Sequence, residues 1–100
     1  MTVQDRFLKY VQVHTASDPD NEQQTPSSAC QWTLAELLKE EMLSMGILDA
    51  RISQYGYVYG SIPATSGYED APALGLIAHM DTSPDFCGEH VHPQIIENYD

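Results

Sequence analysis

The sequence has 100 residues, enough for about one domain, and 42% of them are apolar, which allows a modest core. Fifteen acidic residues against four basic ones give a formal net charge of −11. Nucleic acids and anionic membrane surfaces are bound by clustered Lys and Arg, so this charge argues against both as partners.

The compartment is expected to be the cytoplasm. No apolar run approaches the ~20 residues of a membrane span. The first ten residues, MTVQDRFLKY, lack the basic and apolar regions of a secretory signal. Cys30 and Cys87 form no CxxC pair, and without a secretory signal reduced thiols are the better expectation than a disulfide.

The first half of the chain predicts two helices. Thr2 with Asp5 three residues later resembles a capping box, and apolar residues follow at helical spacing up to Val11. Residues 14–28 are polar and contain two prolines, which predicts a loop. A second helix follows, with caps offered by Thr25 to Ser28 and an end at Gly46. Its expected core face is Trp32, Ala35, Leu38, Met42 and Met45, widened by Leu34, Leu37 and Leu43.

After Gly46 the period changes to that of strands. Residues 48–54 alternate apolar and polar side chains, and residues 57–62 form a second run after a turn at Tyr55-Gly56, which together predict a hairpin. The continuous apolar run Leu74–Ala78 predicts a third strand covered on both faces. We therefore expect an α/β fold of two helices followed by about three strands of a mixed sheet.

This sheet is expected to be incomplete. A strand with two buried faces needs covering elements on both sides, and the apolar pair Ile95-Ile96 has no following element to pack on. We interpret residues 1–100 as the first part of a larger domain.

His79 and Asp81 stand where the third predicted strand ends. Residues two apart in an extended segment point to the same side, so the imidazole and the carboxylate should be neighbours. Neutral imidazole is the commonest protein ligand of zinc, and its second nitrogen is usually held by a carboxylate. The H-x-D pattern alone is weak, because a catalytic zinc needs at least three protein ligands and a lone histidine is more often structural.

Other candidate sites have less support. His90 and His92 could chelate a metal, and His14 lies in an apparent loop. Cys87 has His90 three residues on, so a thiolate nucleophile is an alternative, although a bland packed or surface cysteine is expected far more often. No Gly-rich phosphate loop and no G-x-S-x-G motif is present in the sequence.

Longer motifs carry a resemblance. The segments GLIAHMDTSPD and HPQIIENYD, with TPSSACQWTLAELLKEEMLSMGI, are similar to the N-terminal part of the peptidase T family. These tripeptide aminopeptidases are cocatalytic dizinc metallopeptidases, and the resemblance runs along essentially all 100 residues. H-x-D followed by T-S-P-D is much more specific than H-x-D alone.

The resemblance implies particular roles for two residues. His79 would be a ligand of one of two zinc ions, and Asp81 would be the catalytic-site acid that orients this imidazole. A bridging water would attack the scissile carbonyl of a tripeptide with the help of a glutamate base. That glutamate, the remaining ligands and a second domain have no counterpart in these residues, so this chain alone should be inactive.

A second interpretation is a self-standing, non-catalytic acidic interaction module with a peptidase-like N-terminus. It would require residues 74–78 and Ile95-Ile96 to be buried within the chain or by self-association, whereas the leading interpretation allows a homodimer of the parent enzyme. The sequence does not identify the native metal, the tripeptide preference or the oligomeric state.

Overall fold

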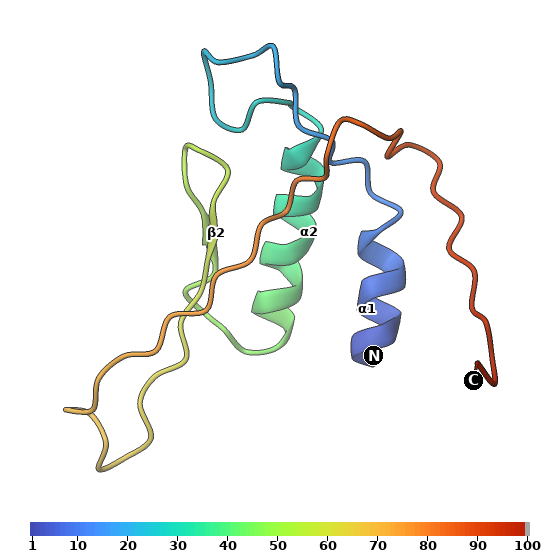
Figure 1. Cartoon of the computed structure of the whole chain (residues 1–100). Helices are drawn as coiled ribbons and strands as arrows, with labels where there is room; N and C mark the ends of the chain where they lie inside the picture. Colours follow the sequence, from blue (N-terminus) through green and yellow to red (C-terminus); the bar gives the residue numbers. More distant parts are fainter. Residues whose placement is uncertain (100) are drawn as a thin grey trace.

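The structure, a computed structural model, describes residues 1–99, and Asp100 lies outside the described residues. Two helices precede a small sheet: α1 is Val3–Tyr10, α2 is Gln31–Ser44, β1 is Arg51–Ile52 and β2 is Val58–Tyr59. Figure 1 shows the two helices beside one another, the hairpin next to α2, and a long extended path from β2 to the C-terminal end. The expected α/β class, with two helices before the strands, is confirmed.

The start of α1 is fixed by a capping box, as the sequence predicts. The backbone N–H of Asp5 donates to the Thr2 hydroxyl (3.1 Å), and the backbone N–H of Thr2 donates to the Asp5 carboxylate (2.7 Å). Each bond satisfies a donor that the helix itself leaves without a partner. Hydrogen bonds from the Thr2 backbone and hydroxyl also lower the pKa of Asp5.

The start of α2 differs from the prediction, and its end agrees with it. Cys30 occupies the N-cap position, and its side chain makes no capping hydrogen bond to the helix. The predicted caps, Thr25 to Ser28, therefore do not occupy the N-cap position. Ser28 instead bonds through its hydroxyl to the Ala16 carbonyl (2.6 Å), which ties the preceding loop to the helix start. Gly46 adopts a left-handed conformation (φ 89°) after the last turn, as expected of a glycine that ends a helix.

The buried centre of the molecule lies on α2. Leu34 and Ala35 are buried and Leu38 and Met42 are half-buried, as the predicted stripe requires, whereas Trp32 and Met45 at its two ends are exposed. Both hairpin strands contact α2. This face of α2 therefore packs against the hairpin.

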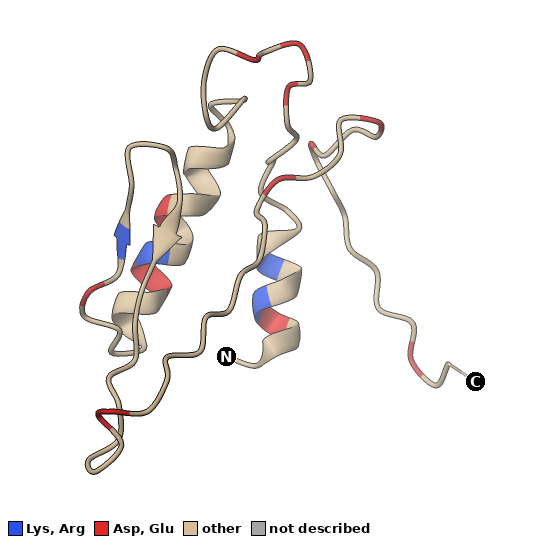
Figure 2. Cartoon of the chain, turned by 60° about the vertical axis from the view of Figure 1, so that its left-hand side comes forward, with Lys and Arg blue, Asp and Glu red and all other residues tan. Residues whose placement is uncertain are grey.

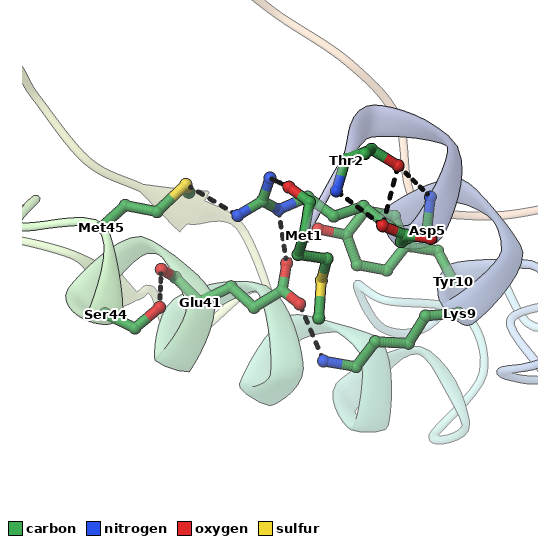
Figure 3. Close-up of polar contacts among 9 residues, drawn as sticks. Met1, Thr2, Asp5, Lys9, Tyr10, Glu41, Ser44 and Met45 are labelled. Atoms are coloured by element: carbon green, nitrogen blue, oxygen red, sulfur yellow. Dashed lines mark hydrogen bonds and ion pairs between the residues drawn. The ribbon is translucent and has the colours of Figure 1, made fainter.

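Glu41 of α2 joins the two helices (Figure 3). Its carboxylate accepts hydrogen bonds from the Lys9 ammonium (2.7 Å) and from the Tyr10 hydroxyl, and it lies 3.5 Å from the Arg6 guanidinium. The Glu41 side chain is only 11% exposed. The bonds from Lys9 and Tyr10 lower the pKa of Glu41, while burial and the bond to Glu41 raise the pKa of Tyr10.

The predicted hairpin is present but shorter than expected. Arg51 pairs with Tyr59 and Ile52 with Val58 in an antiparallel register. Gly56 has φ 79° in the turn, which is the conformation that glycine adopts without a Cβ clash. Beyond β2, the Asp49 carboxylate accepts hydrogen bonds from the backbone N–H (2.9 Å) and hydroxyl of Ser61, closing the open end of the hairpin.

The third predicted strand has no partner within the described residues. Residues 72–80 are extended, and none of their backbone groups hydrogen-bonds to another of residues 1–99. Leu74, Leu76 and Ile77 are 87%, 90% and 100% exposed. The third predicted strand is therefore not formed within residues 1–99, and its exposed apolar side chains agree with the expected incomplete sheet, because no other described residue pairs with its two edges.

The molecule exposes much more surface than a compact domain of its size. Its accessible area is 8300 Å², whereas a compact chain of this mass exposes about 5,700 Å². Its radius of gyration is 16.5 Å, against about 13 Å expected for 100 residues. Among residues 1–99, no helix is long and apolar enough to cross a membrane.

Glu41→Gln should lower the free energy of unfolding by about 1 kcal/mol, which is below the roughly 1.5–3 kcal/mol of a hydrogen bond to a charged group because Lys9 and Arg6 are partly exposed. The folded pKa of Glu41 lies below its usual value, so its stabilisation is complete above about pH 5 and is lost as the pH falls through the folded pKa. Urea unfolding followed by Trp32 fluorescence, repeated between pH 7 and pH 3, measures both effects.

Glu40→Gln is the matched control, because Glu40 is exposed and, among residues 1–99, it pairs only with the neighbouring Lys39 (3.5 Å). Equal unfolding midpoints for the Glu40 and Glu41 variants would contradict the role of Glu41 in joining the helices.

Candidate functional site

His79 and Asp81 are in contact, as their spacing predicts. The Nδ1 atom of His79 lies 2.9 Å from the Asp81 carbonyl oxygen and 3.2 Å from the Asp81 carboxylate. Both of these oxygens are acceptors, so the neutral ring carries its proton on Nδ1. That tautomer leaves the lone pair of Nε2 free for a ligand, and the His79 side chain is 84% exposed.

A parallel bridge holds the loop that carries this pair. The backbone N–H of Thr82 donates to the Thr15 carbonyl (3.1 Å), and the backbone N–H of Ser17 donates to the Thr82 carbonyl (3.1 Å). Thr15 is almost fully buried (2% exposed). Sequence reasoning assigned residues 14–28 to a plain loop and missed this role of Thr15 and Ser17, because no local pattern marks a bridge between such distant segments.

Two apolar hollows flank the segment 78–81. One, of about 880 Å³, lies between the hairpin and this segment, and Leu38 and Met42 of α2 also line it. The other, of about 640 Å³, lies toward α1 and is lined by Phe7, Tyr10 and Phe86 among others. His79 lines both hollows.

The surroundings of the pair are acidic. Figure 2 shows that Lys and Arg are confined to α1, α2 and β1, and residues 61–99 carry acidic residues but no Lys or Arg. A neighbourhood of this sign favours cations over anions. It is compatible with a metal, although the sign of the charge does not identify one.

The donor set within residues 1–99 is one part of a metal site. His79 has the imidazole and the supporting carboxylate that zinc sites use. No group of three or more His, Cys, Asp or Glu residues that could hold a metal ion is brought together among these residues. The chemistry of the pair therefore fits a single zinc ligand with its orienting acid, and a complete site needs further ligands.

The other candidates do not join His79. The Nε2 atom of His14 lies 4.0 Å from the Glu89 carboxylate, and His90 and His92 are exposed. Cys87 is also exposed, and its thiol contacts the Glu89 carbonyl oxygen (4.0 Å) rather than His90. The structure shows no base beside this thiol among the described residues, so the thiol-enzyme alternative gains no support.

Sequence comparison finds relatives along nearly the whole chain. The chain is 52% identical over 99 residues to peptidase T of Desulfitobacterium hafniense, covering 99% of this chain and 23% of the relative. It is 49% identical over 96 residues to peptidase T of a Geobacillus species (96% and 23%), and 48% identical over 94 residues to peptidase T of Vibrio cholerae (94% and 22%). No family model matches the chain.

All three of these relatives are named peptidase T. The chain belongs to the peptidase T family and matches the N-terminal part of its members. It spans about a quarter of the length of the relatives that it matches.

In solution His79 should favour the tautomer protonated on Nδ1, because both Asp81 oxygens accept from that atom. Long-range ¹H–¹⁵N correlation spectra of the ¹⁵N-labelled chain report the tautomer of each histidine. Asp81→Ala should shift His79 toward protonation on Nε2, with the exposed His92 as an internal control. A His79 spectrum that is the same with and without the Asp81 carboxylate would contradict the contact.

Proposed function

We propose that residues 1–100 are the N-terminal part of the catalytic domain of a zinc-dependent aminopeptidase that releases the N-terminal residue of tripeptides. Its second domain and remaining site residues would lie outside this chain. The family membership supports the peptidase, and the His79–Asp81 contact supports its dependence on a metal. The chain alone would be inactive.

In this proposal His79 supplies one imidazole ligand through Nε2. Zinc supplies the chemistry of lowering the pKa of a bound water so that it can attack a peptide carbonyl. Asp81 fixes the tautomer and the orientation of the ring, and its negative charge raises the basicity of the coordinating nitrogen. The Thr15–Thr82 and Ser17–Thr82 bonds keep this loop in place relative to α2.

The alternative of a self-standing interaction module has less support. It requires residues 74–78 and the pair Ile95-Ile96 to be buried within the chain or by self-association, and within the single chain Ile95 and Ile96 are 59% and 75% exposed. A self-contained module rarely leaves so many large apolar side chains in water.

The proposal is tested in a hybrid peptidase, defined as residues 1–100 of this chain followed by the rest of the Desulfitobacterium hafniense relative. His79→Ala should lose one zinc ion per chain and lose tripeptide hydrolysis by more than the roughly 10–100-fold typical of removing an outer partner. Zinc content by atomic emission and release of the N-terminal residue are the measurements.

His92→Ala is the matched control, because His92 is exposed and makes no hydrogen bond to the other described residues. Full zinc content in the purified His79→Ala hybrid would show that His79 is not a ligand. A hybrid that contains zinc and cleaves no tripeptide would count against the proposed substrate.

Asp81→Ala in the hybrid should weaken zinc affinity and hydrolysis by roughly 10–100-fold without abolishing either, since the ligand remains and only its orientation is lost. Asp85→Ala is the control in the same loop, where Asp85 hydrogen-bonds to the Ser83 hydroxyl (2.7 Å). Zinc competition with a chelator of known affinity measures the change. An affinity equal to that of the Asp85→Ala hybrid would remove Asp81 from the site.

A further inference from the structure

The backbone of Asp81 orients His79 as well as its side chain does. Two oxygens of Asp81 face the Nδ1 atom of His79, and the backbone carbonyl is the nearer, at 2.9 Å against 3.2 Å for the carboxylate. That carbonyl shares one planar trans peptide unit with the N–H of Thr82, so the direction of one group fixes the direction of the other. Whatever holds the Thr82 N–H therefore also sets the acceptor for the His79 ring.

The segment 15–17 holds Thr82 through both of its backbone groups. The Thr82 N–H donates to the Thr15 carbonyl (3.1 Å). The Thr82 carbonyl accepts from the backbone N–H (3.1 Å) and from the hydroxyl (3.3 Å) of Ser17. A displacement of residues 15–17 would therefore pass to the Asp81 carbonyl and from there to the imidazole.

The segment 15–17 is in turn fixed to the start of α2. The Ser28 hydroxyl donates to the Ala16 carbonyl (2.6 Å), and the side-chain amide of Gln31 donates to the same hydroxyl (3.0 Å). Gln31 is only 8% exposed, so a nearly buried neighbour holds the hydroxyl in one orientation. The Cys30 thiol also lies 3.6 Å from the Ala16 carbonyl, but a thiol is a weak donor.

One peptide unit connects these two sets of bonds. The Ala16 carbonyl, which accepts from Ser28, and the Ser17 N–H, which donates to Thr82, belong to the same plane. Hydrogen bonds in series polarise and strengthen one another. The hydroxyl of Ser28 therefore both directs and strengthens the backbone bond that holds Thr82.

We propose that Ser28 is a positioning residue for His79. Its hydroxyl does not touch the imidazole. It fixes the Ala16–Ser17 peptide unit and, through Thr82, the Asp81 carbonyl that orients the ring. The inference rests on the proposed function only for its consequence for zinc, because the effect on the ring requires no metal.

Ser27 provides the matched control for a serine that only stabilises the loop. Its hydroxyl accepts from the Asp18 N–H (2.9 Å), so it also ties the chain before α2 to the loop that begins at residue 14. Both serines are half-buried. The bond of Ser27 leads away from Thr82, so Ser27→Ala should lose a bond of the same kind without an effect on His79.

The metal-free hybrid peptidase tests the effect on the backbone. The amides of Ser17 and Thr82 should exchange with solvent about three- to tenfold faster in Ser28→Ala, as expected of one lost neutral hydrogen bond, and at an unchanged rate in Ser27→Ala. Amide hydrogen exchange read at single residues measures this. Equal Thr82 exchange in the two alanine variants would overturn the proposal.

The ring itself is read by selective ¹⁵N labelling of histidine in the same metal-free hybrid. The fraction of His79 protonated on Nε2 should rise in Ser28→Ala, by less than in Asp81→Ala, and should stay unchanged in Ser27→Ala. A His79 spectrum that Ser28→Ala leaves unaltered would overturn the proposal.

Ser28→Thr and Ser28→Val form a second pair, of equal size, in which only threonine keeps the hydroxyl. Ser28→Thr should behave as the unchanged hybrid and Ser28→Val as Ser28→Ala, in both amide exchange and the His79 spectrum. This pair separates the hydrogen bond from the effect of side-chain volume. Identical results for threonine and valine would contradict a role of the hydroxyl.

The consequence for the metal is measured in the zinc-loaded hybrid. Ser28→Ala should weaken zinc affinity by about three- to tenfold, less than the roughly 10–100-fold expected of Asp81→Ala, because the carboxylate still supports the ring. Competition with a chelator of known affinity gives the values. Equal zinc affinities of the Ser27→Ala and Ser28→Ala hybrids would show that the position set by Ser28 does not reach the metal.

These readouts separate the inference from the function. A changed His79 spectrum in Ser28→Ala, together with full zinc content in His79→Ala, would preserve the positioning of the ring and remove His79 as a ligand. Loss of zinc in His79→Ala, together with an unaltered His79 spectrum in Ser28→Ala, would do the reverse.

Discussion

The carboxylate of Glu41 is the contact on which the rest of the arrangement depends. It holds Lys9, Tyr10 and Arg6 against α2, and thereby fixes where α1 ends. The chain then runs directly into Thr15 and Ser17, whose backbone groups hold Thr82. Thr82 follows Asp81, the partner of His79. This half-buried carboxylate thus stands at the start of a series of contacts that leads along the chain to the candidate site.

The sequence predicts those parts of the fold that are set by local chemistry. The capping box of Thr2 and Asp5, the left-handed Gly46 and the hairpin turn at Gly56 each depend on residues within a few positions, and each is present. The start of α2 was not predictable in this way. Ser28 looks like a cap, but its hydroxyl bonds to the distant Ala16 carbonyl, and tertiary contact overrides the local preference.

In the candidate site, too, local features are predictable from the sequence and contacts between distant residues are not. The proximity of His79 and Asp81 follows from the two-residue period of extended backbone, so the sequence predicts it. The support from Ser17 comes from a residue 65 positions away, and two short polar segments give no periodic signal that they will pair. The burial of Leu74–Ala78 was expected from the apolar run itself. The apolar run predicts that this segment is stable only when its side chains are buried. Residues 1–99 provide no partner that buries them.

The segment without backbone partners, residues 72–80, contains the single candidate metal ligand, His79. We infer that the two features are coupled. His79 lies at the end of the segment whose backbone has no partners, and it lines the same hollow. A single imidazole on an exposed, unpaired segment has no fixed direction in which to present its lone pair beyond the orientation that Asp81 gives it. Pairing of the strand edges would fix the backbone on which His79 stands, and additional ligands could then converge on one point. Because a metal binds a preformed set of ligands far more tightly than separate ones, completion of the sheet and binding of the metal would stabilise each other.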